Sequence, residues 1–170
     1  MKIKSVLCTI LALLAVLSLA SCGNKTLSDT LNCDEILDAA LKSQDNPPEG
    51  LEIYKKSDGS LDSYKLSLFA YGKFEECDDF ELIDDCVFYT CGGTQSFEID
   101  IIKAKDADSA IKADELLAAR LKTISEGDRA AYDPNFESMI SSAVHFTSGR
   151  FAVLLITFDT PSAKDAILNL

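Results

Sequence analysis

The chain has 170 residues, with 16 Lys and Arg against 28 Asp and Glu, and its net charge is -12. Hydrophobic residues make up 47% of it and charged residues 26%, which is enough for a buried core, and the length favours one domain. The acidic balance argues against a nucleic-acid partner, because binding phosphates takes clustered Lys and Arg. With one histidine in the chain, a metal site with two histidine ligands is excluded.

The first 21 residues have the pattern of a signal peptide. Lys2 and Lys4 form a short positive region, and residues 5–20 are almost entirely apolar. A membrane-spanning helix needs about 20 apolar residues, so this run is short for a stable span and suits a secretion signal. We therefore expect residues 1–21 to direct export.

The signal ends in Leu19, Ala20, Ser21 and Cys22. This order resembles the lipobox of bacterial lipoproteins, in which an aliphatic residue and two small residues precede a cysteine that carries lipid. The resemblance implies cleavage before Cys22 and acylation of its sulfur. An ordinary secretory signal, or an uncleaved anchor that contains a cysteine, is the alternative.

Acylation would give the protein a membrane lipid as its partner, through Cys22. Two or more acyl chains give stable anchoring, whereas one chain does not. Residues 22–32 are polar and rich in turn formers, so we expect a flexible tether there, followed by a single domain over 33–170. The expected location is the extracytoplasmic face of the cell membrane.

The first part of the domain holds one clear helix and one ambiguous stretch. Asn32 suits a helix N-cap, and apolar residues at helical spacing predict a helix over 33–44. Residues 51–72 fit helical and strand spacing alike, and we favour a short helix there. Seven acids lie within 75–85, where we expect a solvated loop.

The middle of the domain reads as strand, turn, strand and helix. Residues 87–89 suggest a strand, and residues 97–103 alternate between apolar and acidic side chains, which predicts a second strand. A helix should follow, capped by Asp106 or Asp108. The break at Asp133 and Pro134 precedes a further helical turn or two over 135–142.

The C-terminal part predicts a hairpin and a closing helix. Taking Ser148 and Gly149 as the turn places Phe146 opposite Phe151. Residues 151–158 are apolar on both faces and should form a central strand, and Asp159 or Ser162 should cap the last helix. The fold class we expect is α+β, a small antiparallel sheet of about three or four strands packed on one face by helices.

Four cysteines remain in the domain, namely Cys33, Cys77, Cys86 and Cys91. An even number in an exported protein makes them candidates for disulfides. On a continuous strand Cys86 and Cys91 would lie about 17 Å apart and could not bridge each other, which favours Cys33 or Cys77 as their partners. A zinc site is less favoured because no Cys-x-x-Cys pair exists, and four reduced thiols are the remaining alternative.

No catalytic motif stands out in the sequence. There is no Gly-rich phosphate loop, nucleophile elbow or His-Glu-x-x-His motif. The acidic run 75–85 allows two alternative functions, a divalent-cation site or, with His145, a hydrolase. The run has no glycine for a calcium loop, and we expect His145 to be structural or exposed.

The second half of the domain resembles a family of small bacterial lipoproteins. The matching residues are 99–103, then Arg120 in its helix, Tyr132-Asp133-Pro134, and Gly149-Arg150-Phe151 with the apolar strand after it. In this order they resemble the domain-of-unknown-function 4358 family, found chiefly in Firmicutes. The resemblance implies location and fold, and no catalytic residue.

From the sequence we therefore expect no enzyme and no cofactor or metal. We expect a non-catalytic binding or interaction module, held at the membrane, with an envelope protein as a further partner.

Overall fold

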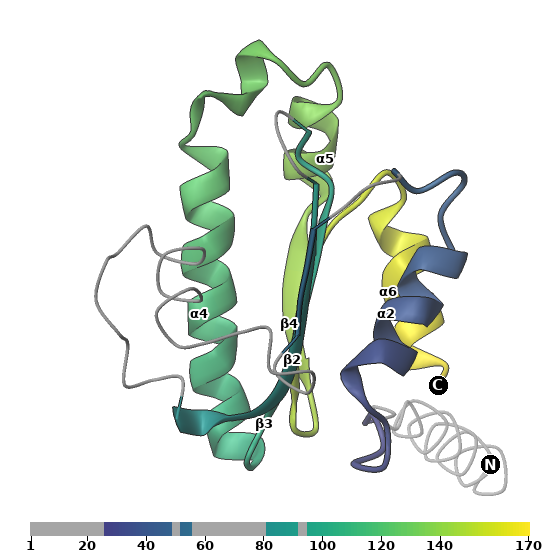
Figure 1. Cartoon of the computed structure of the whole chain (residues 1–170), viewed down its shortest axis with the longest axis vertical. Coiled ribbons are helices and arrows are strands. Elements are labelled where there is room, and N and C mark those ends of the chain that lie inside the picture. Colours follow the sequence, from purple (N-terminus) through teal and green to yellow (C-terminus); the bar gives the residue numbers. More distant parts are fainter. Residues whose placement is uncertain (1–25, 49–51, 56–80, 92–94) are drawn as a thin grey trace, which may run out of the picture.

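The computed structural model describes residues 26–48, 52–55, 81–91 and 95–170. In these ranges the chain forms one antiparallel sheet with helices on both of its faces (Figure 1). The strands are β1 Glu52–Lys55, β2 Ile83–Thr90, β3 Glu98–Ala104, β4 Val144–Ser148 and β5 Phe151–Ile156, in the order β1-β2-β3-β5-β4. The helices are α2 Cys33–Lys42, α4 Ala107–Ser125, the 3-10 turn η2 Asp128–Ala131, α5 Phe136–Ser142 and α6 Thr160–Leu168.

The α+β class and the antiparallel sheet are confirmed. Four strands form the body of the sheet, and the short strand β1 adds an edge to it. The placement of the helices differs from the expectation: α4 covers one face, while α2 and α6 lie side by side on the other (Figure 1). The neighbouring strands β3 and β5, inside the sheet, are accordingly buried on both faces.

Arg120 explains why the acidic face of β3 is covered. We assigned Glu98 and Asp100 to a face separate from Ile99 and Ile101, and the register confirms that separation. The acidic face is buried beneath α4, where Arg120 supplies a positive charge. A buried charge needs a partner. The partner of Glu98 is Arg120, which lies 22 residues further along the chain on helix α4.

The predicted helix starts agree with the structure. Asn32 and Glu35 form a capping box at α2, since the Asn32 oxygen accepts from the Glu35 N–H at 2.8 Å and the Glu35 carboxylate accepts from the Asn32 N–H at 2.9 Å. Asp106 caps α4 by accepting from the Ser109 N–H, and Asp159 caps α6 by accepting from the Ser162 N–H. These bonds to the charged form lower the pKa of both aspartates.

The hairpin register is two residues away from our prediction. Phe146 lies opposite Val153, and Ser148 opposite Phe151. The turn consists of Gly149 and Arg150, and Gly149 adopts a φ of 61° that other residues rarely take. A shift of two keeps every side chain on its predicted face. Residues 52–55 form strand β1 where we favoured helix, and 56–72 lie outside the described residues.

Part of the predicted tether is docked on the domain. Leu27 is buried and its N–H donates to Ser148 Oγ at 3.0 Å. Lys103 Nζ donates to the carbonyls of Asp29 and Leu31, both at 2.7 Å. The folded domain therefore begins near Leu27 rather than at residue 33, because an apolar side chain within the polar segment reaches the core.

Candidate functional site

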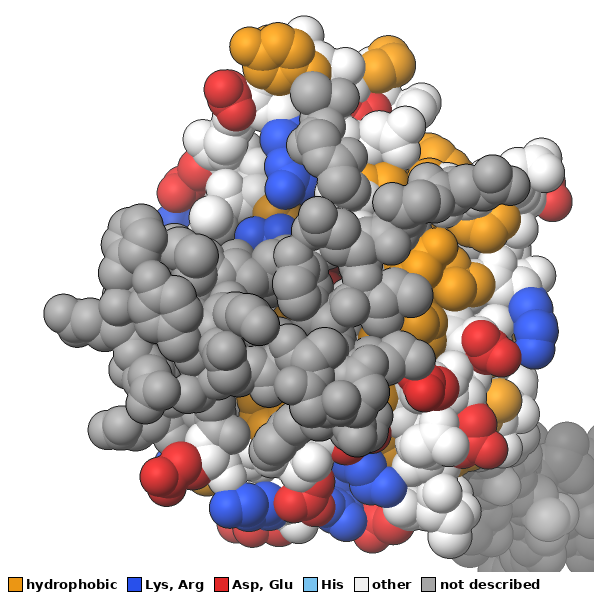
Figure 2. Space-filling view, in the orientation of Figure 1, with side chains coloured by type: hydrophobic (Ala, Val, Ile, Leu, Met, Phe, Trp, Pro, Cys, Tyr) orange, Lys and Arg blue, Asp and Glu red, His pale blue; other side chains and the backbone are white. Residues whose placement is uncertain are grey.

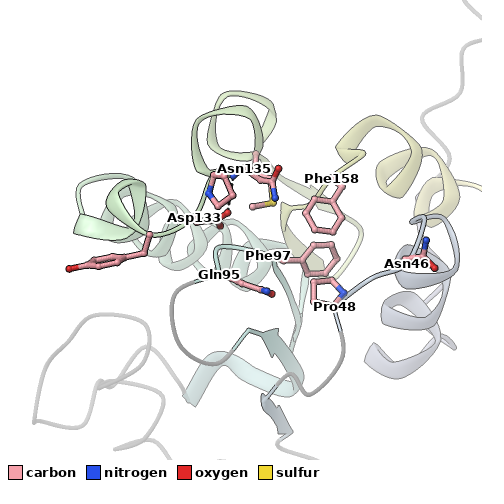
Figure 3. A pocket seen from close by; sticks show the side chains of 10 residues that line it. Asn46, Pro48, Gln95, Phe97, Asp133, Asn135 and Phe158 are labelled. Atoms are coloured by element: carbon pink, nitrogen blue, oxygen red, sulfur yellow. Dashed lines mark hydrogen bonds between the residues drawn. The ribbon is translucent and has the colours of Figure 1, made fainter.

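A pocket of about 400 Å³ opens at the end of the sheet that lies away from the β4–β5 hairpin (Figure 3). This volume is in the range of small-molecule sites. Four connections between elements line it, together with one residue of α5. The lining residues are Asn46, Pro48, Gln95, Phe97, Tyr132, Asp133, Pro134, Asn135, Met139 and Phe158.

Two phenylalanines form the apolar part of the pocket. Phe97 is buried and Phe158 is 48% exposed, and their ring centroids lie 5.2 Å apart. Tyr89 holds Phe97 from the side, with its ring edge-on at 6.5 Å, and its hydroxyl donates to the Pro48 carbonyl at 3.3 Å. The ring of Phe97 is thus held in place at the bottom of the pocket, and the ring of Phe158 beside it is accessible to a ligand.

Asp133 holds the polar side of the pocket together. One carboxylate oxygen accepts from the Ser96 N–H at 2.7 Å, and the other accepts from the Asn135 N–H at 2.9 Å. Arg129 adds a bond to the Gln95 carbonyl at 3.2 Å. These contacts join the segment before β3 to the segment before α5, so they fix the positions of Gln95 and Asn135.

Gln44 joins the other two connections. Its buried side-chain amide donates to the Asp159 carbonyl at 2.8 Å and accepts from the Asp159 N–H at 2.9 Å. The segment after α2, which carries Asn46 and Pro48, is thereby held beside the connection that carries Phe158. The pocket is therefore largely pre-formed.

The lining offers three side-chain amides. Asn46, Gln95 and Asn135 are exposed, and Figure 3 shows Asn135 beside Phe158 and Gln95 near Phe97. An amide presents both donors and acceptors. Gln95 Oε1 accepts from the Cys91 thiol at 3.1 Å, while Asn135 forms no side-chain cap bond at the start of α5.

A second polar group lies beneath α4, away from the pocket. Arg120 donates to both carboxylate oxygens of Glu98, at 2.7 and 2.9 Å, and Thr90 donates to the same carboxylate at 3.1 Å. Both oxygens of Asp100 are buried without a hydrogen-bond partner in the described part of the chain. Burial raises the pKa of Asp100 well above its ordinary value, the Glu98 charge raises it further, and Arg120 opposes them.

His145 is exposed and lies on the α4 face of the sheet, opposite to Val144 and Phe146 as predicted. Its Nδ1 lies 2.9 Å from Asp114 Oδ1 on α4. The hydrolase hypothesis paired His145 with acids of the run 75–85, whereas the acid bonded to it is Asp114. No local pattern indicates this pair, because the two residues are 31 positions apart.

The described end of the acidic run belongs largely to strand β2. Asp84 forms an ion pair with Arg150, and Asp85 accepts from the Cys86 N–H at 2.9 Å. Residues 75–80 lie outside the described residues. Within the part of the chain that the structure describes, no group of three His, Cys, Asp or Glu side chains is arranged to hold a metal ion.

Three of the four domain cysteines are described, namely Cys33, Cys86 and Cys91, and all three are buried. Burial raises the pKa of Cys33, and burial together with Asp133 raises the pKa of Cys91 to about 11. No disulfide joins these three to one another. Cys77 and Cys22 lie outside the described residues, so a bridge to Cys77 and acylation of Cys22 stay predictions.

The pocket was not anticipated from the sequence. Some of its residues fall within predicted elements, but not within a predicted site. Phe97 begins a predicted strand, Asp133 and Pro134 form a predicted break, and Phe158 ends a second predicted strand. The useful signal was the dipeptide Asp-Pro after an aromatic residue, which marks a constrained loop. Nothing in the sequence indicated that this loop would meet the residues after α2.

No family model, curated protein or solved structure matches this chain. The resemblance to the domain-of-unknown-function 4358 lipoproteins therefore stays a hypothesis. In the described residues no helix is long and apolar enough to cross a membrane.

Proposed function

We propose that this protein is an extracytoplasmic lipoprotein, anchored in the cell membrane through acylated Cys22, and that its domain binds a ligand in the end pocket without transforming it. The location is supported by the N-terminal sequence, a charged start and an apolar run that end in Leu19-Ala20-Ser21-Cys22. The resemblance to small bacterial lipoproteins agrees with this proposal.

One observation about the domain carries the binding role: the pocket and the point where the chain enters the domain lie at opposite ends of the sheet. Leu27 docks at the hairpin through Ser148, whereas Phe158 follows β5 at the other end (Figure 1). A lipid on Cys22 would hold the hairpin end near the bilayer. The pocket would then face the solution, where a ligand can reach it.

The surface agrees with this arrangement. Figure 2 shows hydrophobic side chains on the right of the upper half of the molecule, while acidic and basic side chains alternate along its lower edge. Around the pocket, Phe158 is 48% and Tyr132 64% exposed. Exposed aromatic residues beside a cavity are characteristic of ligand or partner sites, so an envelope protein is the second kind of partner we propose.

The anchor is tested by metabolic labelling with palmitate. We expect the full chain to be labelled and recovered with membranes, and Cys22→Ala to lose the label. Cys8→Ala is the matched control, because Cys8 lies within the predicted signal peptide and should leave labelling unchanged. An unlabelled full chain, or equal labelling of Cys22→Ala, would contradict the proposal.

The pocket is tested by screening a chemically mixed library of small molecules against the full chain in detergent, with NMR line positions as the readout. We expect at least one compound to shift signals of pocket residues, and Phe158→Ala to remove the shift. Ile111→Ala is the control, since Ile111 is a 58% exposed apolar residue of α4 outside the pocket lining. Failure of every compound would refute a small-molecule site.

A further inference from the structure

The charges around the pocket decide which ligands it can hold. Among the described residues that line it there is no Lys, Arg or Glu, and a single acid, Asp133. Both oxygens of that carboxylate already accept backbone N–H groups, from Ser96 and Asn135. The described lining thus has no unused charged group with which to recognise an ion, and burying an unpaired charge is costly. The chemistry of the lining therefore favours a neutral ligand.

The remaining polar side chains of the described lining are the three amides and the hydroxyl of Tyr132, and two of the amides lie near the aromatic rings. Asn135 lies beside Phe158 in Figure 3, and Gln95 lies on the Phe97 side. Amides both donate and accept hydrogen bonds, so they suit a ligand whose polar groups do the same. The ring of Phe158 suits a ligand with an apolar face.

A sugar ring combines these two properties. One face of a pyranose carries C–H groups that pack on an aromatic ring, and its edge carries hydroxyls that donate and accept hydrogen bonds. We infer that the pocket binds a neutral sugar, with the ring on Phe158 and its hydroxyl or acetamido groups bonded to Asn46, Gln95 and Asn135. This inference rests on the proposed binding function and specifies its ligand.

The shape of the site favours a sugar over a peptide. Peptide recognition commonly uses an exposed sheet edge or a long groove. This site is a pocket of about 400 Å³ at the end of the sheet, bounded by four connections and α5. Its rim is fixed by the paired bonds of Gln44 to Asp159, so it suits a compact, rigid ligand.

The test is an NMR titration of the full chain in detergent with two neutral probes, N,N′-diacetylchitobiose and cellobiose. We expect at least one probe to shift pocket signals at millimolar concentration. Phe158→Ala should weaken that binding at least about tenfold, which corresponds to 1.4 kcal/mol. Ile111→Ala should leave it unchanged.

Two amide variants complete the test without disturbing the fold. Asn135→Ala removes a side chain that makes no cap bond. Asn46→Gly removes a second amide and suits the positive φ of 53° at this position, where alanine would be strained. Each should weaken sugar binding several-fold, and a thermal melt in the same detergent shows that each variant is folded. Sugar binding that neither variant weakens would overturn the assignment of the amides.

The outcomes separate the two proposals. If neither sugar binds, while another library compound binds in a manner that depends on Phe158, the sugar inference is wrong and the pocket function stands. If no compound of any class binds, the sugar inference and the small-molecule site are both wrong. Sugar shifts that persist in Phe158→Ala would also overturn the inference, because they would come from another surface.

Discussion

Replacing Arg120 by methionine should strongly destabilise the domain. The guanidinium makes two bonds to Glu98, and the side chains are 8% and 0% exposed. Without it, two buried carboxyl groups, Glu98 and Asp100, would lose their described positive neighbour. Removing one partner of a buried ion pair costs about 3–5 kcal/mol. For a chain of this size that corresponds to a drop in Tm of roughly 6–20 °C.

The loss should depend on pH, and its sign follows from the same contacts. Arg120 lowers the pKa of Asp100 against the effects of burial and of Glu98. In the variant the folded-state pKa of Asp100 would rise further above its unfolded value. A carboxyl group with a raised folded pKa loses stability as pH increases above the unfolded pKa, by up to about 1.4 kcal/mol per pH unit. The variant should therefore come closest to the wild type in acid.

The assay is urea unfolding between pH 4 and pH 8, followed by circular dichroism, on chains that begin at residue 22 with Cys22→Ser. Lys122→Met is the matched control, because Lys122 lies on the same helix and pairs with Glu126 at 3.8 Å with both side chains mostly exposed. Exposed pairs contribute about 0–1 kcal/mol. The reasoning is refuted if Arg120→Met costs no more than Lys122→Met, or if its cost shrinks as pH rises.

Three further predictions concern the same domain. Asp100→Asn should flatten the dependence of the unfolding free energy on pH above about pH 4. The raised pKa of the wild-type carboxyl group makes the folded domain less stable as pH rises through that range. An unchanged pH profile in urea unfolding would contradict this. Asn32→Ala should cost about 1 kcal/mol by removing the capping box of α2, whereas Asn32→Asp should retain most of it. Iodoacetamide should modify Cys33, Cys86 and Cys91 in unfolded chains only, since the thiols are buried, and peptide mass mapping of folded protein that finds rapid labelling would show that these sites open.

The elements predicted well are those encoded by neighbouring residues. The capping box of Asn32 and Glu35 and the alternation over 97–103 each lie within a few positions, and both gave correct elements. The hairpin register was wrong because it depends on which residue takes a positive φ. Serine and glycine adjoin at 148–149, and placing Gly149 first in the turn rather than second moves the register by two.

The features that were missed depend on residues far apart in the chain. Alternation shows that Glu98 and Asp100 share a face, but nothing near them indicates that Arg120 will cover that face. The pocket is a stronger case, because Asn46 and Phe158 are brought together by the bonds of Gln44 to a segment 115 residues away. Local pattern predicts which residues form a strand, and only the packed sheet decides which strand ends meet.

The proposed anchor and the pocket lie at opposite ends of the sheet, and this arrangement bears on which ligand can reach the pocket. From Cys22 to Leu27 the chain spans five residues, at most about 18 Å, so an acylated Cys22 would keep the hairpin end close to the bilayer. Strand β5 adds six residues, roughly 20 Å at 3.3 Å per residue, between that end and Phe158. With the sheet upright on the membrane, a pocket at this height would be out of reach of a lipid headgroup in the same membrane. The proposed anchor would then favour a ligand from the aqueous space above the membrane, which agrees with the proposed neutral sugar rather than a lipid.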